Sequence, residues 1–547
     1  MIKKTLAILC AVLLIVSSFA ACSGKDGSDA DFIVPIESEP RSLDPQIAAD
    51  AVSDIVITNC FEGLVRINEH GEVAPGLAKS WDVSADGLEY IFHLKDDSRW
   101  HLTKSFVAVL GKDFNKTFDT RVTAGDFVFG LRRAVMPLTA SPYASSLFMI
   151  KNARQVNDGS LQPELLGVVA TDEFTLKITL ANQTVDFLNL LASPVSMPCN
   201  ETFFSAVKGK YGLGNNYLLC NGPFYLADWE RGVALKLRKF KNDKYASSAT
   251  PNSVTLRINQ DVGKYAQNVS LGIYSAAEIG ASSAASLAPS DDMTLKEYPN
   301  ITGAICFKSS EKSLSNTSVR LALCKALDKG SLGIAFSGET WTGKLIPACC
   351  TIGQTPYSEF KQDLSPLGFD PGAAQKLWSK GLLDLSAKQI ALVLLCTPES
   401  ETAMRGLIQD WQKTLGVSLS ISVEVVDSVE LQKRLSNGNY QIALAPIKAN
   451  KSAAIDFLQN FESDNPNNIL RYKSAAYDNI LIQARTAADA QEAARLCSLA
   501  QNEILQNGVV YPLFSQSSYL AMGKGVTDIY TLPAGECASF INAKKID

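Results

Sequence analysis

Residues 62–81 read EGLVRINEHGEVAPGLAKSW, and residues 87–100 continue as GLEYIFHLKDDSRW. Residues 123–135 read TAGDFVFGLRRAV, and SPYAS follows at residues 141–145. The first stretch contains glycines at positions where tight turns need a positive φ, which predicts turns there. Tyr90, Phe92 and Leu94 alternate with their neighbours, which predicts a strand with one apolar face. Thr123 predicts the N-cap of a helix with Asp126 in its acidic first turn. These patterns indicate a β-rich module with one capped helix.

The order and spacing of the four segments resemble the signature region of the peptide and nickel class of bacterial solute-binding proteins. Members of this family are the extracytoplasmic receptors of ABC importers. The resemblance continues beyond the signature and covers about residues 32–515. Five further segments carry it: NGPFY at 221–225, NTSVRLALCKALD at 316–328, PGAAQKLWSK at 371–380, YKSAAYDNILI at 472–482 and VVYPLF at 509–514. The apolar residues of 316–328, beginning at Val319, and those of 371–380 recur at helical spacing, which predicts a helix in each segment.

The resemblance implies an α/β, two-lobe periplasmic-binding-protein fold in which crossing strands form a hinge. Ligand is expected between the lobes, and hinge closure is the expected motion. We expect lobe 1 to comprise residues 31–260 and 511–547, and lobe 2 to comprise residues 261–510. Within lobe 1, residues 56–185 are expected to form the extra subdomain that distinguishes this class.

The N-terminus predicts export. Lys3 and Lys4 precede an apolar run at residues 6–16, and small residues lead to Cys22. This is the pattern of a signal peptide, here residues 1–21, and the run is too short for a comfortable membrane span. Cys22 after two alanines resembles the lipobox of bacterial lipoproteins, so we expect its lipidation, with residues 22–30 as a flexible tether. The alternative is an ordinary secretory peptide that merely contains a cysteine.

Composition places the rest of the chain among large globular proteins. Hydrophobic residues make up 46% and charged residues 20% of the 547 residues, which excludes disorder of the whole chain. The net charge of -5 gives no basic footprint for nucleic acid. Ten cysteines remain after Cys10 and Cys22 are set aside, and none forms a CxxC pair. They predict either buried free thiols, typical of an anaerobic cell, or one or two long-range disulfides. The ten are Cys60, Cys199, Cys220, Cys306, Cys324, Cys349, Cys350, Cys396, Cys497 and Cys537.

Catalytic motifs are absent from the sequence. It contains no GxSxG elbow, no HExxH zinc motif and no phosphate-binding loop. His70, His93 and His101 are the only histidines, and all three lie in the signature region. We therefore expect a binding protein with no catalytic residues, no metal site and no cofactor.

Residues 139–145, TASPYAS, resemble the oligopeptide-binding branch of the family. That branch holds an extended peptide between strands of both lobes through backbone hydrogen bonds, with side chains in wet pockets. The corresponding strands here would be residues 38–42 and 445–448, and Tyr143 would line the cleft unless it is a packing residue of the subdomain. The resemblance thus implies seven ligand-binding residues: Glu39, Arg41, Tyr143, Pro446, Ile447, Lys448 and Asn450.

Asn450 departs from the branch, whose aspartate at this position pairs with the α-amino group of the peptide. Asparagine accepts a hydrogen bond but cannot neutralise a buried ammonium. Ile447 stands where the branch has a tryptophan. Asp456 or Glu462 could have taken over as the anchor through a shifted loop. Pro40 and Pro446 also remove backbone donors from the expected ligand-pairing strands.

Three functions follow from these observations. The favoured one is a lipid-anchored, monomeric receptor on the outer face of the cytoplasmic membrane or in the periplasm, which delivers oligopeptides to an ABC permease. The second is the same fold binding a sugar, a modified peptide or a nickel chelate. The third is a sensor or adhesin lipoprotein that takes no part in transport.

Overall fold

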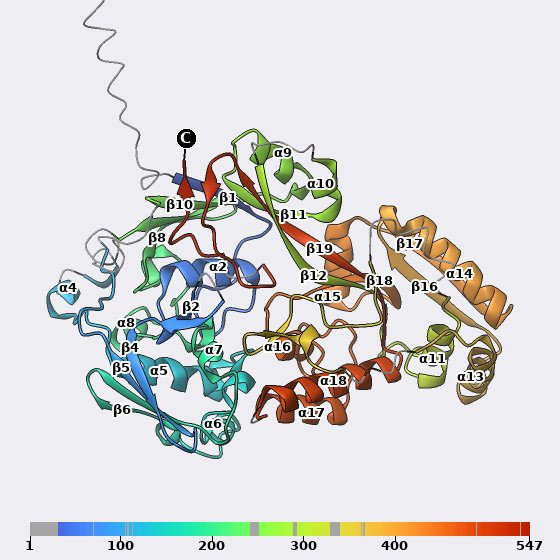
Figure 1. Ribbon diagram of the computed structural model, residues 1–547, viewed down its shortest axis with the longest axis horizontal. Helices are drawn as coiled ribbons and strands as arrows, with labels where there is room; N and C mark the ends of the chain where they lie inside the picture. Colours follow the sequence, from blue (N-terminus) through green and yellow to red (C-terminus); the bar gives the residue numbers. More distant parts are fainter. Residues whose placement is uncertain are drawn as a thin grey trace, which may run out of the picture.

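The structure is a computed structural model that describes residues 31–68, 71–103, 106, 109–111, 113–240, 251–287, 293–328, 340–362, 364, 367–487, 489–535 and 538–546. The expected signal peptide and tether, including Cys22, lie outside these residues. Figure 1 shows two bodies joined by long strands. We call the blue-to-green body on the left lobe 1 and the yellow-to-red body on the right lobe 2.

Lobe 1 is built on two four-stranded sheets. The first runs in the order β1-β10-β9-β8, with β1 and β10 parallel and the other pairs antiparallel. Its strands are β1 (Asp31–Ile36), β8 (Phe224–Glu230), β9 (Ala234–Lys239) and β10 (Ser253–Ile258). The second is antiparallel in the order β4-β5-β7-β6. Its strands are β4 (Ala78–Val83), β5 (Glu89–Leu94), β6 (Val168–Asp172) and β7 (Thr175–Thr179).

The signature region folds as the sequence predicts. β5 buries Phe92 and Leu94 on one face, and the predicted helix is α5 (Ala124–Val135), where the backbone N–H of Thr123 donates to Asp126 Oδ2 at 2.8 Å. The remaining elements of lobe 1 are β2 (Val65–Ile67), β3 (Val73–Pro75), α2 (Ala51–Cys60), α4 (Phe114–Thr117), α6 (Ala153–Asn157), α7 (Phe187–Leu191) and α8 (Glu201–Ala206).

Two glycines of the recognised segments allow backbones to approach closely. A Cβ on Gly76 would lie 2.5 Å from the carbonyl oxygen of Gly63, and one on Gly222 would lie 2.7 Å from Cys60 C and Phe61 N. Any larger residue would therefore push these segments apart. Gly222 thus joins the NGPFY segment to the end of α2.

Lobe 2 is organised by one large mixed sheet in the order β11-β19-β12-β18-β16-β17. β16 is parallel to both β17 and β18, and the other neighbours are antiparallel. The strands are β11 (Ala276–Gly280), β12 (Met293–Phe307), β16 (Ile390–Cys396), β17 (Leu419–Val425), β18 (Ile442–Lys448) and β19 (Val510–Gly523), with the short β13 (Thr340–Trp341) paired to β19.

Helices cover both faces of this sheet and enclose separate cores. One core contains α11 (Thr317–Lys325), α13 (Pro371–Asp384) and α14 (Glu401–Leu415), of which the first two are the helices expected from residues 316–328 and 371–380. The other core contains α15 (Ser428–Asn437), α16 (Ala454–Gln459), α17 (Ala475–Arg485) and α18 (Ala490–Gln506). A small third cluster surrounds β11 with α9 (Tyr265–Ser270) and α10 (Ala281–Ser286).

β12 and β19 connect the bodies, as Figure 1 shows. Their pairing is interrupted between Tyr298 and Ile301. There the buried Asn300 side chain donates to Ser518 Oγ at 2.8 Å and to the carbonyl oxygen of Ala534 at 2.7 Å. These bonds fix the irregular point of the crossing strands.

The chain then returns to lobe 1. Phe540 packs in its core with Phe32, ring centroids 6.4 Å apart, and its backbone N–H donates to Asn59 Oδ1 at 2.9 Å. Two short strands, β20 (Val526–Thr527) and β21 (Lys544–Lys545), pair with each other. β19 itself contributes Tyr511, Leu513 and Phe514 to a lobe 2 core.

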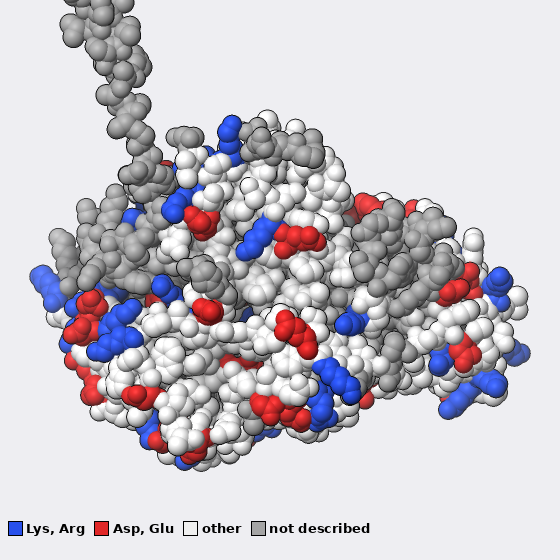
Figure 2. All heavy atoms as spheres, in the orientation of Figure 1, with Lys and Arg blue, Asp and Glu red and all other residues white. Residues whose placement is uncertain are grey.

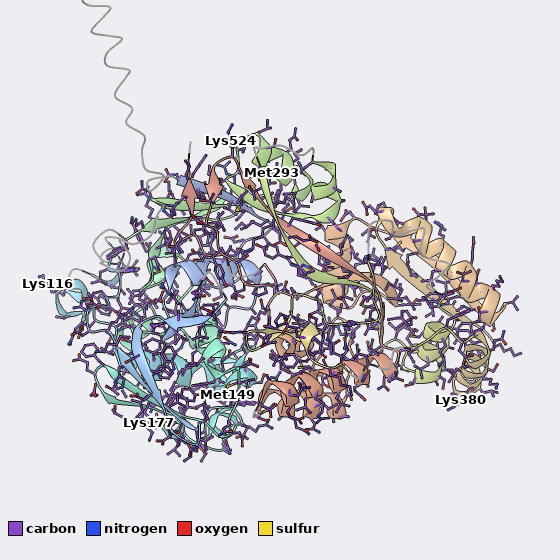
Figure 3. All side chains as sticks on the ribbon, viewed as in Figure 1. Lys116, Met149, Lys177, Met293, Lys380 and Lys524 are labelled. Carbon is purple, nitrogen blue, oxygen red and sulfur yellow. The ribbon has the colours of Figure 1, made fainter. Side chains whose placement is uncertain are left out.

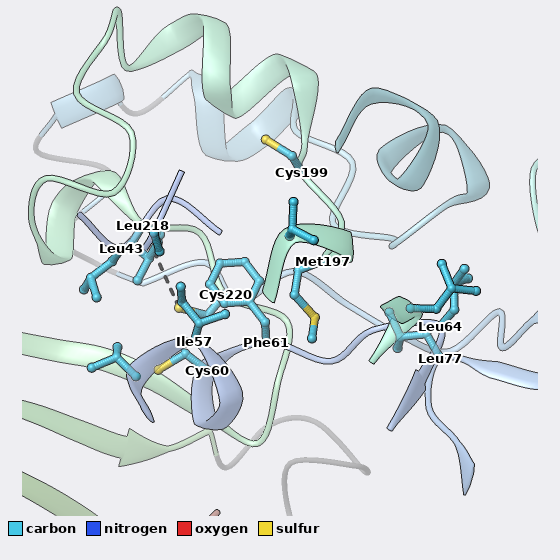
Figure 4. Packing of buried hydrophobic residues seen from close by; sticks show 14 of the residues in the cluster. Leu43, Ile57, Cys60, Phe61, Leu64, Leu77, Met197, Cys199, Leu218 and Cys220 are labelled. Carbon is cyan, nitrogen blue, oxygen red and sulfur yellow. Dashed lines mark hydrogen bonds between the residues drawn. The ribbon is translucent and has the colours of Figure 1, made fainter. Parts of the chain in front are cut away.

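None of the nine cysteines that the structure describes is joined in a disulfide, and all nine are buried. Figure 4 shows Cys60 and Cys220 among the apolar side chains of the lobe 1 core. The alternative of a disulfide between two of these nine cysteines is therefore wrong, whereas Cys537 lies outside the described residues. Burial raises the pKa of the Cys324 thiol to about 12, so these thiols serve as small apolar side chains.

Candidate functional site

The two lobes touch along one line of polar contacts. Lobe 1 contributes residues 143–145 and 184–186, which precede and follow strands of its antiparallel sheet, and lobe 2 contributes residues around α16 and the end of α17. The hydrogen bonds join Asp186 Oδ1 to the N–H of Gly353 (3.0 Å), Thr184 Oγ1 to the carbonyl of Arg485 (3.2 Å) and Gln459 Nε2 to Ser145 Oγ (3.3 Å). The described arrangement is thus closed.

Tyr143 lies on this line, where the sequence predicts a ligand-binding residue. Its ring faces Lys451 of lobe 2, whose Nζ lies 3.9 Å from the ring centroid. Lys451 lowers the pKa of the Tyr143 hydroxyl, but burial and the carboxylates of Asp54, Asp456 and Asp50 outweigh it, so this pKa is raised. The tyrosine therefore stands among three acidic groups and one basic group.

Asp54 supplies the buried charge of this cluster. It lies in the first turn of α2, whose N-cap Asp50 accepts from the N–H of Ser53 at 2.9 Å. Its residue surface is only 8% exposed. Burial raises the pKa of the Asp54 carboxyl to about 6, Lys451 opposes that shift, and Asp50 adds to it. A carboxylate that is costly to ionise thus lies at the lobe junction.

Glu39 and Arg41 lie in an irregular segment, because β1 ends at Ile36. The prediction of a strand over residues 38–42 is therefore wrong. Glu39 Oε1 accepts from Trp229 Nε1 at 2.8 Å and from Arg231 at 3.1 Å, so lobe 1 itself uses this carboxylate. Arg41 is exposed, and its backbone N–H donates to Asp50 Oδ2 at 3.3 Å, which places it beside the Tyr143 cluster.

Pro446, Ile447 and Lys448 form the end of β18. Pro446 is exposed and Ile447 is buried. Lys448 forms an ion pair with Glu278 of β11. Burial, followed by the charge of Glu278, raises the pKa of the nearby Glu37 carboxyl, and Lys448 opposes this shift. Lys448, Glu278 and Glu37 thus form a second charged group beside the crossing strands. It is separate from the charged groups around Tyr143.

Asn450 is exposed, and the structure instead brings its neighbour Lys451 to Tyr143. Of the two alternative anchors, Asp456 lies near Tyr143, whereas Glu462 accepts from Arg485 NH1 at 2.8 Å. Lys451, Asp54 and Asp186 also lie at the lobe junction and were not predicted from the sequence. No sequence motif marks Asp54 or Asp186. Lys451, however, is adjacent in the sequence to the predicted ligand-binding residue Asn450, and this position could have identified it.

A cavity of about 660 Å³ opens at the outer end of the lobe junction. Lobe 1 lines it with the hairpin at residues 86–89 and with residues 145–155 and 179–182, and lobe 2 lines it with Ile482, Arg485 and Thr486. Figure 3 places Met149, one of the lining residues, at the edge of lobe 1 that faces α17. Its lining residue Ser145 is close to Tyr143 in the sequence, but neither Tyr143 nor Lys451 lines the cavity.

The two histidines that the structure describes make local contacts within lobe 1. His93 Nε2 lies 2.8 Å from Asp82 Oδ2 at the surface, and His101 is buried with Nε2 2.5 Å from the carbonyl oxygen of Gly222. His70 lies outside the described residues. Among the residues that the structure describes, no group of three histidine, cysteine or acidic side chains could hold a metal ion. In the same part of the chain, every helix is too short or too polar to cross a lipid bilayer.

Surface charge is mixed on the face drawn in Figure 2, where Lys and Arg side chains lie singly or beside Asp and Glu. Ion pairs also form between side chains at the surface, such as Arg405 with Glu401 and Arg495 with Glu492. The described residues of this face thus form no single-sign stripe of the kind on which nucleic-acid backbones bind.

Comparison with known proteins agrees with this architecture. The family model of bacterial extracellular solute-binding proteins, family 5 (middle), matches residues 72–468. The dipeptide-binding protein of Lactococcus lactis is 25% identical over 93% of each chain. The oligopeptide-binding protein OppA of Bacillus subtilis is 27% identical over 94% of each chain.

Solved structures show the same fold. Listeria monocytogenes OppA bound to peptide superposes with a TM-score of 0.75 at 24% identity, covering 95% of this chain and 99% of the other. The predicted α/β, two-lobe fold with hinge strands and an extra subdomain is confirmed.

Proposed function

Because the chain belongs to the bacterial extracellular solute-binding proteins of family 5, we propose that it is the substrate-binding protein of an ABC importer and captures oligopeptides between its lobes. The names of its relatives, a dipeptide-binding and an oligopeptide-binding protein, support a peptide ligand. Binding proceeds without chemistry, and release to a permease follows when the lobes reopen. The seven residues that the resemblance implies remain part of this proposal, with Tyr143 and β18 as its centre.

The observation that carries the proposal is the direct contact of the two lobes around Tyr143. Asp186, Ser145 and Tyr143 of lobe 1 each contact a lobe 2 residue, while the extended strands β12 and β19 connect the bodies at the crossing. Such a construction closes by bending at a few strand positions, and it encloses whatever lies between the lobes. The domain boundaries remain part of the proposal, with residues 31–260 and 511–547 in lobe 1 and residues 261–510 in lobe 2.

Mass spectrometry tests the ligand class. The protein purified under native conditions is weighed intact, and the extra mass is released by unfolding and fragmented. We expect a mixture of short peptides, since backbone recognition reads little sequence. Protein that has been unfolded and refolded without ligand serves as the control. A single mass that belongs to a sugar or a metal chelate would contradict the peptide function and favour the second candidate.

Anchoring is the finer part of the proposal. We propose that Cys22 carries the lipid that holds the protein at the outer face of the cytoplasmic membrane or in the periplasm, since two or more acyl chains give stable attachment. Cys22→Ser is expected to release the protein or leave it unprocessed, and to abolish palmitate incorporation. Cys10→Ser, within the expected signal peptide, is the matched control. Label retained by Cys22→Ser would refute the anchor.

A further inference from the structure

Lys451 enters a site that lobe 1 builds from acidic and aromatic groups. The Tyr143 ring lies under its ammonium at 3.9 Å. The charge of Asp54 acts on both Lys451 and Tyr143, and the charges of Asp50 and of Asp456 of lobe 2 act on Tyr143. A cation is therefore held where the lobes meet.

The chemistry of these groups is that of an ammonium site. The face of a tyrosine ring attracts a cation, more strongly where water is excluded. Two carboxylates of α2 add favourable charge, and the burial of Asp54 at 8% exposure keeps that charge poorly screened. Lobe 1 thus forms a binding site for a cationic group, and in the closed form the Lys451 ammonium occupies this site.

We propose that Lys451 is a specificity determinant that fills this ammonium site when the lobes close. A peptide amine would have to compete with a lysine that is already tethered at the site. The wild-type protein therefore gains no affinity from a free N-terminal amine and accepts peptides whose amine is blocked or lies elsewhere. This inference rests on the proposed function as a peptide receptor and names the class of peptide that it takes.

Two variants separate this role from a purely structural one. In Lys451→Met, the side chain keeps its length but loses its charge, and the vacated site becomes available to the ligand amine. In Lys451→Arg, the cation remains and the site stays filled. Lys380→Met is the matched control, because Lys380 is exposed on α13 at the far end of lobe 2 (Figure 3).

The measurement is calorimetry on one peptide identified from the purified protein, prepared with a free and with an acetylated N-terminus. Wild type, Lys451→Arg and Lys380→Met should bind the two forms within about threefold of each other. Lys451→Met should prefer the free amine by roughly tenfold or more, which is the scale of a desolvated cation–π contact. Thermal unfolding of each variant shows that it is folded.

Two results would overturn the inference. One is a wild-type preference of about tenfold or more for the free amine. The other is an equal loss of affinity for both peptides in Lys451→Met, which indicates that Lys451 only links the lobes. Binding of neither form to the wild type or to any variant would refute the peptide function itself, and this inference with it.

Discussion

Asp186 of lobe 1 accepts the backbone N–H of Gly353 of lobe 2 at 3.0 Å. Burial, followed by the charge of Asp456, raises the pKa of the Asp186 carboxyl, while the bonds from Gly353 and Asn189 oppose the shift. Opening of the lobes removes this environment. The Asp186 carboxyl, which joins the lobes through this hydrogen bond, is therefore also a group that titrates.

Closure should accordingly depend on pH. Above the ordinary pKa of a carboxyl and below the raised one, the closed form holds a proton that the open form has lost, so acid favours closure and rising pH weakens it. Asp186→Asn keeps an acceptor for Gly353 but cannot ionise. We expect ligand affinity of the wild type to fall as the pH rises above the ordinary pKa of a carboxyl, and that of the variant to change less.

The measurement is the dissociation constant as a function of pH in wild type, Asp186→Asn and the control Asp464→Asn. Asp464 is exposed in lobe 2, and its Oδ1 lies 3.6 Å from Lys473 Nζ. Asp456, Arg485 and Cys497 also face the Asp186 region, so a residual slope is expected in the variant. Identical slopes in wild type and Asp186→Asn would contradict the assignment.

Asp54 should make the folded protein less stable at neutral pH than in mild acid. The pKa of the Asp54 carboxyl is about 6 in the folded protein, above the ordinary value of 3.8. Between these two pH values the folded state holds a proton that the unfolded state has lost, and the resulting stabilisation is lost as the pH rises through 6. The full effect is about 3 kcal/mol. Asp54→Asn should remove this slope from the urea-unfolding free energy. Equal pH slopes for wild type and variant would show that Asp54 is not the group responsible.

Gly303 is required by the crossing strands. A Cβ at this position would lie 2.2 Å from the ring of Phe514 on the neighbouring strand. We expect Gly303→Ala to lower the unfolding free energy by about 1–3 kcal/mol through overpacking, and Gly303→Ala with Phe514→Leu to recover part of it. Gly406→Ala, in α14 with nothing within 4 Å of its Cβ, is the control and should be neutral or stabilising. An unfolding free energy unchanged in Gly303→Ala would refute the clash.

Local patterns were sufficient for much of the fold. Thr123 and Asp126 did cap α5, and the helical spacing around Val319 did mark α11, because caps and apolar periodicity act within one or two turns. The strand expected at residues 38–42 failed because those residues form no ladder, and pairing depends on a partner strand far away in the sequence.

The site was predictable only in part. The resemblance placed Tyr143 near the lobe junction, and the structure brings it to Lys451. The prediction at Asn450 identified the loop after β18 that contacts lobe 1. Which side chain of this loop reaches lobe 1 depends on how the lobes close, and sequence alone does not give that. Asp54 was invisible in the sequence because its raised pKa comes from burial by distant segments.

The thiols should be unreactive in the folded protein. All nine described cysteines are buried, and burial raises the pKa of the thiols of Cys60 and Cys199, which leaves little thiolate at neutral pH. For a soluble form that begins after Cys22, we expect an aromatic disulfide reagent to label at most Cys537 rapidly. All ten thiols should react after unfolding in urea. Rapid labelling of several thiols in the folded protein would contradict their burial.

Arg133 of α5 and Asp44 form a buried ion pair that fixes the signature helix to the loop after β1. Arg133 NH2 donates to Asp44 Oδ2 at 2.6 Å, NH1 donates to Gln46 Oε1 at 2.8 Å, and the guanidinium lies 3.9 Å from the Phe204 ring centroid. The two side chains are only 8% and 5% exposed. Removing one partner leaves the other charge buried and unpaired.

We therefore expect Arg133→Met to lower the unfolding free energy in urea by about 3–5 kcal/mol. Combining it with Asp44→Asn should restore part of the loss, because the buried carboxylate is then also removed. Arg121, which is exposed to water and pairs with Asp119 at 2.6 Å and with Glu173 at 2.7 Å, gives the control. Arg121→Met should lower the unfolding free energy much less than Arg133→Met, since water screens the charges. Equal losses for Arg133→Met and Arg121→Met would mean that burial does not set the strength of the Arg133 pair.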